Sequence, residues 1–159
     1  MVCSNRTTGT LIAMNAIIFL QNAWSPRYAG KTWPRISWLR ALEASRSGKR
    51  LKVLTDDLTI CHNTTPKIAK VSSGFIPPDE LHIREILNNR NPDIVIACGK
   101  SAEDVLKRLW EGPLLAIPHP ASRLLTNALY EYARNMLYCN VRLRLALRQK
   151  KGYFYIEKL

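Results

Sequence analysis

His119 is the histidine whose neighbours best suit it for chemistry. It follows the apolar run 114–117 directly and lies between Pro118 and Pro120. Because proline restricts the backbone on both sides, the imidazole is held on a stiff turn. An imidazole held in this way can donate a hydrogen bond to negative charge that develops on a leaving group. The alternative is a capping or core histidine that the backbone satisfies.

Gln21 and Asn22 carry the second candidate group, because they follow the apolar run 16–20. The Asn22 amide can position a water molecule or a sugar, but an amide is not a general base at neutral pH. The alternative for Asn22 is an Asx turn that ends the strand.

Asp56 follows a weaker apolar run at 51–55. An ionised carboxylate only accepts hydrogen bonds, so it suits a partner that donates, such as an amino group. Two alternatives stay open. Asp57 is the inward-facing residue, because strand side chains alternate, or Asp56 caps a helix or pairs with a basic side chain.

The segment 24–33 mixes aromatic with basic side chains, a combination that suits base stacking and phosphate contact. Core packing of its tryptophans is the alternative, and Trp38 and Trp110, which lie in helical patterns, are predicted to be core residues. The residues of this segment that we expect to contact a nucleic acid are Trp24, Arg27, Lys31 and Trp33.

Gly99, Lys100 and Ser101 follow the strongest apolar run, 93–98, and lead into a helix. A helix N-terminus can bind an anion, but the sequence has neither the spacing of a P-loop nor the glycine fingerprint of a dinucleotide fold. Its four cysteines are too far apart for a zinc or iron–sulfur motif. We therefore expect reduced thiols, no metal and no cofactor.

All these candidate residues follow predicted strands of one fold. Apolar runs that alternate with helical patterns predict right-handed βαβ units. The expected fold is a single-domain, three-layer α/β/α sandwich with a central, four-stranded, mainly parallel sheet, in which ligands bind beyond the carboxyl ends of the strands. The predicted strands are 16–20, 51–55, 93–98 and 114–117, and the predicted helices are 34–48, 78–89, 101–109 and 122–148.

The chain is strongly basic. Its 159 residues hold 24 Lys and Arg against 12 Asp and Glu, a formal net charge of +12. The fold does not require this excess, so it indicates a polyanionic partner, with nucleic acid first and an anionic membrane surface second. A basic surface that serves solubility alone is the alternative, and residues 142–151 are interpreted as a solvated helix face.

We divide the chain into a flexible lead at 1–13, an α/β domain at 14–150, and a tail or short edge strand at 151–159. The apolar stretch 11–20 resembles the core of a signal peptide, but it is too short to span a bilayer and Asn15 interrupts it. The expected location is therefore the cytoplasm, in a bacterial or phage-like context.

Taken in order, the groups that follow the strands resemble the motifs of the uracil-DNA glycosylase superfamily. The resemblance covers residues 15–138 and is greatest to the mismatch-specific and uracil glycosylase-like branches without an iron–sulfur cluster. The similar segments are 18–24 (IFLQNAW) at the end of the first strand, 29–34 (AGKTWP) around the aromatic residue that stacks on the flipped base, 54–56 (LTD) at the end of the second strand, 92–102 (PDIVIACGKSA) at the third strand and its helix start, and 117–122 (IPHPAS) at the closing His-Pro-Ser motif.

The resemblance implies a monofunctional DNA glycosylase that flips a pyrimidine out of DNA and hydrolyses its N-glycosidic bond. Uracil is the first expected substrate and a modified pyrimidine the second. The expected partner is DNA, as a duplex with a flipped base or as a single strand, with no membrane contact and no oligomer beyond the monomer. The implied site comprises catalytic Asn22 and His119; Gln21, Trp24, Trp33 and Asp56 around the base; and Arg27, Lys31, Lys100, Ser101, Ser122, Arg123 and Leu124 on the DNA, where Arg123 or Leu124 would wedge into the vacated stack.

Two other functions stay open. Leu20, Asn22 and Ala23 depart from the commonest form of the first motif, so the chain can also be a catalytically inactive DNA-binding or regulatory protein on the same scaffold. A basic protein of the membrane surface is the third interpretation, and it draws on the C-terminal arginines alone.

Overall fold

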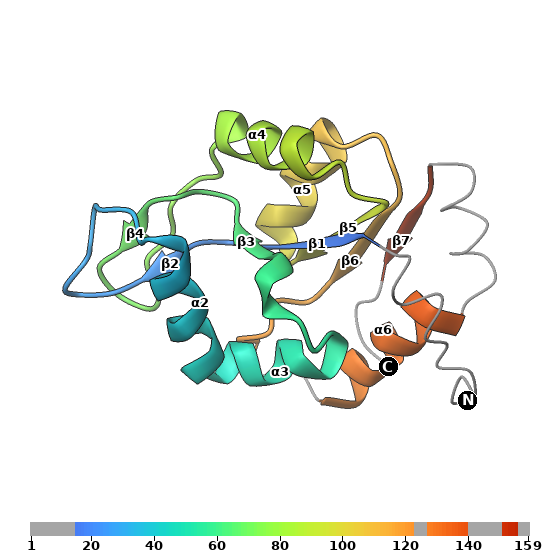
Figure 1. The fold of residues 1–159 in the computed structure, drawn as a ribbon, viewed down its shortest axis with the longest axis horizontal. Coiled ribbons are helices and arrows are strands. Elements are labelled where there is room, and N and C mark those ends of the chain that lie inside the picture. Colours follow the sequence, from blue (N-terminus) through green and yellow to red (C-terminus); the bar gives the residue numbers. More distant parts are fainter. Residues whose placement is uncertain (1–14, 123–126, 140–150, 156–159) are drawn as a thin grey trace.

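The computed structural model describes residues 15–122, 127–139 and 151–155, and within them the centre of the protein is a five-stranded sheet (Figure 1). The strand order is β3-β1-β5-β6-β7, and every pairing is parallel. The prediction of an α/β protein with a parallel sheet is confirmed, with five strands instead of four. The strands are β1 Ala16–Leu20, β3 Cys61–Asn63, β5 Ile94–Cys98, β6 Leu114–Ile117 and β7 Tyr153–Tyr155.

Helices cover both faces of this sheet (Figure 1). Along β1, Ile18 and Leu20 belong to one buried cluster with residues of α2, α3 and α6, whereas Ile17 and Phe19 belong to another with residues of α4 and α5. A strand buried on both faces is an unbroken apolar run, as β1 is. The helices are α2 Arg35–Ala44, α3 Arg46–Leu54, α4 Glu80–Arg90, α5 Lys100–Leu109 and α6 Asn127–Cys139.

Residues 51–55 form the end of helix α3 and its cap, so the prediction of a strand there was wrong. Leu51 and Leu54 are both fully buried, at the i, i+3 spacing of one helix face. Ser45 begins the helix, because its side chain accepts a hydrogen bond from the Gly48 amide (3.0 Å). The predicted helix at 34–48 is therefore divided at Ser45 into α2 and α3.

The strand that neighbours β1 in place of the predicted one is β3, which the sequence pattern missed. Its last residue pairs with the last residue of β1, in the register Leu20↔Asn63. A strand of three residues with a single apolar side chain has no recognisable period. A short 3₁₀ turn, η1 at Leu58–Ile60, leads into it.

The remaining elements fall close to their predicted positions. Helix α5 begins at Lys100, one residue before the predicted Ser101 cap. The edge-strand alternative for the C-terminal segment is confirmed by β7, which pairs with β6. The predicted lead at 1–13, the helix positions 123–126 and 140–148, and most of the basic stretch 142–151 lie outside the described residues.

A second, two-stranded parallel sheet lies at one end of the molecule (Figure 1). It consists of β2 (Ala23–Trp24) and β4 (Ile68–Ala69). Backbone hydrogen bonds from Ser25 N to Ala69 O (2.8 Å) and from Gly30 N to Ile68 O (2.9 Å) extend the pairing. We call residues 23–33 and 67–76 the β2–β4 platform.

Two cysteines of the described part, Cys61 and Cys98, are buried and free. Burial raises the pKa of both thiols, that of Cys61 to about 12, so they stay protonated at neutral pH. The Cys3 and Cys139 side chains lie outside the described residues. No helix in the described ranges is both long and apolar enough to cross a lipid bilayer.

Candidate functional site

A cleft of about 460 Å³ lies beyond the carboxyl ends of β1, β3 and β6. This volume is within the range of pockets that hold small ligands. The cleft brings together five of the residues that the sequence predicted, although they come from three separate segments. These are Gln21, Asn22, Trp24, Trp33 and His119, and the walls also include Trp38 of α2 and Asn63 of β3.

The hydrogen bonds of His119 determine its tautomer. Its Nδ1 atom accepts a hydrogen bond from the Ala121 amide (3.0 Å), so Nδ1 carries no proton. Burial lowers the pKa of His119 to about 4, and the ring is therefore neutral at pH 7. In the neutral ring the proton must be on Nε2. His119 thus supplies the cleft with an uncharged N–H donor on a half-buried ring.

The turn that carries His119 is fixed by two residues that the sequence analysis did not identify. Arg50 of α3 donates from Nη1 to the carbonyl oxygens of Pro120 (2.6 Å) and Ser122 (2.9 Å). The hydroxyl of the fully buried Tyr130 donates to the carbonyl oxygen of Pro118 (2.8 Å). Helices α3 and α6 therefore hold the turn from both of its ends.

Gly99 packs directly against the His119 side chain. It has a φ of +95°, and a Cβ atom added to it would lie 3.3 Å from the Cβ of His119. The left-handed conformation and the close approach both favour glycine. The glycine predicted from the sequence as part of an anion site is thus, in the structure, a support for His119.

The Asn22 amide is fully engaged by the protein. Its Oδ1 atom accepts hydrogen bonds from the Ile76 amide (3.1 Å) and Gln21 Nε2 (3.2 Å). Its Nδ2 atom donates to the carbonyl oxygens of Gly74 (3.1 Å) and Ala23 (3.1 Å). An amide makes four good hydrogen bonds at most, so no group remains for a water molecule or a sugar. This differs from the predicted catalytic role and makes Asn22 a clamp on the loop at 71–76.

Asn63 is the site residue that sequence reasoning missed. It ends β3 beside Leu20 and lines the cleft, and its Oδ1 atom is buried without a hydrogen-bond partner among the described residues. The neighbouring Thr64 ties the two strand ends together, because its hydroxyl donates to the Gln21 carbonyl oxygen (2.7 Å). The available signal was an Asn-Thr-Thr-Pro turn after the short apolar stretch at 58–61.

A smaller cavity of about 140 Å³ adjoins the cleft and shares Trp33, Trp38 and Asn63 with it. Three buried polar atoms without a partner in the described part of the chain belong to its lining residues: Trp33 Nε1, His62 Nε2 and Asn63 Oδ1. Burial, with a smaller contribution from the nearby Arg35 charge, lowers the pKa of His62 to about 3. The cavity therefore holds, beside the Arg35 guanidinium, three uncharged polar atoms that a polar group or water can satisfy.

Asp56 does not reach the cleft. Because residues 51–55 are helical, Asp56 precedes β3 and lies near the amino ends of the strands. Its side chain is 86% exposed and pairs with Arg134 (3.6 Å). Asp57 caps η1 by accepting a hydrogen bond from the Thr59 amide (2.9 Å), and hydrogen bonds from Thr59 lower the pKa of Asp57. The alternative of capping and ion pairing is confirmed, and Asp56 is no base reader.

The other residues predicted to contact DNA are dispersed. Lys100 is exposed and pairs with Asp104 within α5 (3.2 Å), and neither it nor Ser101 lines the cleft. Ser122 donates its amide to the His119 carbonyl oxygen (2.9 Å) and so closes the histidine turn. Arg27 and Lys31 are exposed on the β2–β4 platform, with the Arg27 guanidinium 5.3 Å from the ring centre of Tyr28. Arg123 and Leu124 lie outside the described residues.

In the described ranges, no three His, Cys, Asp or Glu side chains come close enough to hold a metal ion. Among the described residues that line the cleft, the polar side chains carry imidazole, amide, hydroxyl and indole groups. Comparison with known proteins gives no match to any family model, curated protein or solved structure. The geometry of the cleft therefore carries the functional argument by itself.

Proposed function

We propose that this protein is a DNA base glycosylase of the uracil-DNA glycosylase type, which holds a flipped pyrimidine in the cleft and hydrolyses its N-glycosidic bond. The observation that carries the proposal is the pair formed by His119 and Asn63: a neutral N–H donor and an amide whose Oδ1 atom has no partner among the described residues line one cleft. The net charge of +12 supports a polyanionic partner.

His119 has the form that leaving-group stabilisation requires. When the bond between the base and C1′ breaks, its electron pair stays on the ring nitrogen of the base, and negative charge is delocalised onto an adjacent carbonyl oxygen of the base. The Nε2–H of a neutral histidine donates a hydrogen bond to that oxygen and keeps its proton. A water molecule then adds to C1′, and the proton that it loses ends on the departing base. A preorganised donor of this kind contributes about 3–4 kcal/mol to such reactions.

Asn63 takes the reading role that we expected of Asp56. A uracil edge offers an N3–H donor and an O4 acceptor, and an amide matches both with Oδ1 and Nδ2. Trp33 and Trp38 supply aromatic walls, with ring centres 6.3 Å apart. This edge pattern favours uracil over a cytosine-type base, because cytosine presents an amino donor in place of O4.

A second candidate, a catalytically inactive DNA-binding protein on this scaffold, is favoured by one specific observation. The Asn22 amide is hydrogen-bonded to the backbone of the loop at 71–76. None of the described residues that line the cleft is an Asp or Glu, so no carboxylate activates the water. Binding through the same walls needs neither group.

The test is a panel of oligonucleotides, each with one uracil, mismatched base or modified pyrimidine, scored for cleavage at abasic sites. We expect excision of uracil by the unaltered protein. His119→Ala should lower turnover by about 10²–10³-fold while DNA affinity changes little, because its contribution is made in the transition state.

Two further variants separate recognition from chemistry. Asn63→Asp removes the donor to O4, so we expect the preference for uracil over cytosine-type bases to fall. Asp56→Asn, at the far edge of the sheet, is the matched control and should excise as the unaltered protein does. Binding without strand scission across the whole panel would establish the inactive protein and exclude the enzyme.

A further inference from the structure

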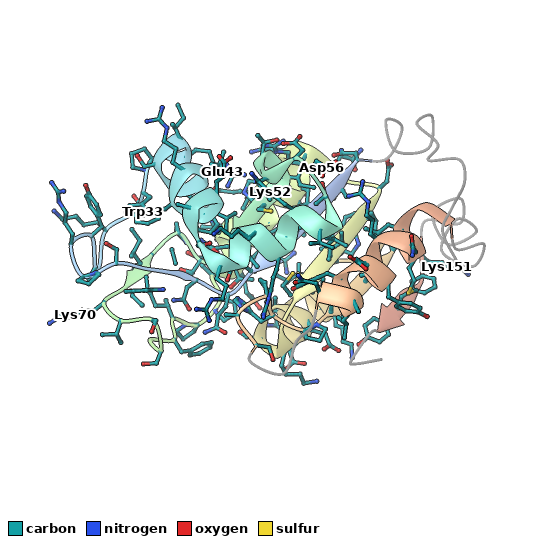
Figure 2. All side chains as sticks on the ribbon, turned by 90° about the horizontal axis from the view of Figure 1, so that it is seen from below. Trp33, Glu43, Lys52, Asp56, Lys70 and Lys151 are labelled. Atoms are coloured by element: carbon teal, nitrogen blue, oxygen red, sulfur yellow. The ribbon has the colours of Figure 1, made fainter. Side chains whose placement is uncertain are left out.

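The β2–β4 platform borders the cleft, because Trp24 and Gly74 belong to both. It projects beyond the main sheet at one end of the molecule (Figure 1). In Figure 2 the labelled Trp33 and Lys70 lie at this end and Lys151 at the opposite one. The units next to one that occupies the cleft can therefore reach the platform.

The platform holds large apolar side chains in solvent. Trp24 is 50% exposed and Phe75 is 55% exposed. Phe75 stands between the two backbone groups that the Asn22 amide binds, the Gly74 carbonyl and the Ile76 amide. The backbone on both sides of Phe75 is held by this part-buried clamp, whereas its ring is exposed to water. An exposed ring on a held backbone suits contact with a planar partner, since little backbone entropy is lost on binding.

The charges around these rings have one sign. Residues 21–42 and 58–78 contain no Asp or Glu. In the part of the chain that the structure describes, no ion pair involves the basic side chains of the platform itself. The basic residues of the two segments are Arg27, Lys31, Arg35, Arg40, Lys67 and Lys70.

We propose that the platform binds single-stranded nucleic acid, with bases stacked on Trp24 and Phe75 and phosphates near Arg27, Lys67 and Lys70. The choice of this partner rests on the proposed function of the cleft, and it deepens that function by making a single strand the preferred substrate. Bases in a duplex already stack on one another and present no free face. An exposed ring beside unpaired cations is the combination found where unpaired bases bind.

The experiment is fluorescence anisotropy with a labelled 12-nucleotide thymine strand and with a duplex of equal length. We expect tighter binding of the single strand. Trp24→Ala and Phe75→Ala should each weaken it about 5- to 150-fold, which corresponds to about 1–3 kcal/mol for a stacked base. Leu81→Ala is the control, because Leu81 on α4 is 68% exposed but lies outside the platform.

A charge variant tests the proposal independently of the rings. Lys67→Glu with Lys70→Glu should weaken single-strand binding and reduce its dependence on salt. Circular dichroism should show an unchanged fold in each variant, because all the altered side chains are exposed. Equal affinity of the unaltered protein, Trp24→Ala and Phe75→Ala for the thymine strand would overturn the proposal. Tighter binding to phosphatidylglycerol vesicles than to the strand would also overturn it and would favour a membrane surface.

The binding experiment and the excision experiment test the two proposals separately. Loss of strand binding in the platform variants, together with no excision on any substrate, would leave the platform proposal intact and remove the proposed function. If the platform variants excise uracil as well as the unaltered protein does, and duplex DNA is the preferred substrate, the proposed function stands and the platform proposal is overturned.

Discussion

The side-chain amide of Asn22 makes four hydrogen bonds, and two of them fix the backbone on either side of Phe75. Asn22→Ala removes the partners of the Gly74 carbonyl and the Ile76 amide. We expect the free energy of unfolding to fall by about 1–3 kcal/mol, the usual cost of a part-buried polar group left without its partner. Urea denaturation measures this loss, and hydrogen exchange at the Ile76 amide should accelerate.

Asn22→Asp is the informative control for this clamp. The carboxylate still accepts from the Ile76 amide but cannot donate to the Gly74 carbonyl oxygen. Exchange at Ile76 should therefore stay closer to that of the unaltered protein than in Asn22→Ala. If Asn22→Ala unfolds at the same urea concentration as the unaltered protein, the amide is no clamp and is available for chemistry after all.

Residue chemistry alone placed His119 at the cleft correctly, but it placed Asp56 there wrongly. The two prolines beside His119 restrict the backbone of its turn, so its position could be inferred from neighbours in the chain. The position of Asp56 depended on whether residues 51–55 form a strand. Asn63 could be recognised as a cleft residue only from the pairing of β3 with β1.

At the scale of elements, helices α2 and α3 meet at Gly48. A Cβ atom at Gly48 would lie 1.9 Å from the carbonyl oxygen of Leu42, a backbone atom that cannot move aside. At an exposed helix position, replacing glycine with alanine adds about 1 kcal/mol of stability. Here we expect Gly48→Ala to cost about 1–3 kcal/mol instead, as overpacked cores do.

Thermal or urea unfolding of Gly48→Ala checks this sign. Lys49→Ala, an exposed neighbour in the same helix, is the control and should change stability by a few tenths of a kcal/mol at most. A more stable Gly48→Ala protein would show that α2 and α3 do not pack as closely as described. Since Arg50 of α3 binds the His119 turn, a displaced α3 should also lower excision.

The same pair of helices shows which secondary structure local sequence patterns fail to predict. Strands β1, β5 and β6 are buried on both faces and stand out as apolar runs. The stretch 51–55 is a weaker apolar run, and in the structure it packs in the cluster of α6 within a helix that Ser45 caps. Short segments of this kind are decided by tertiary contacts that no local period reveals.

For the whole molecule, two half-buried histidines link stability to pH. Burial holds the pKa of His119 at about 4 and that of His62 at about 3, whereas both titrate near 6.5 in an unfolded chain. Below pH 6.5 the unfolded state binds more protons, so stability falls as pH falls towards 4. The expected slope is at most about 1.4 kcal/mol per pH unit for each histidine.

Urea unfolding between pH 7.5 and 5 measures this slope in the range where most carboxylates stay ionised. His119→Gln should remove about half of it, since Gln does not titrate. A free energy of unfolding that is constant from pH 6.5 to 5 would mean that the two rings are solvated and protonate freely in the folded protein.

The order of strands in the sheet also bears on how the chain acquires its structure during synthesis. β1 lies between β3 and β5, and the Asn15 amide just before it binds the carboxylate of Asp93, 78 residues further along the chain. At about 5–20 residues per second, a ribosome needs roughly 4–16 seconds to make that stretch. Throughout this interval the apolar segment of β1 has left the ribosome without its β5 partner. For seconds, therefore, the edge of β1 that pairs with β5 has no partner in the nascent chain. We expect chaperones that bind extended apolar segments to associate with the chain at β1.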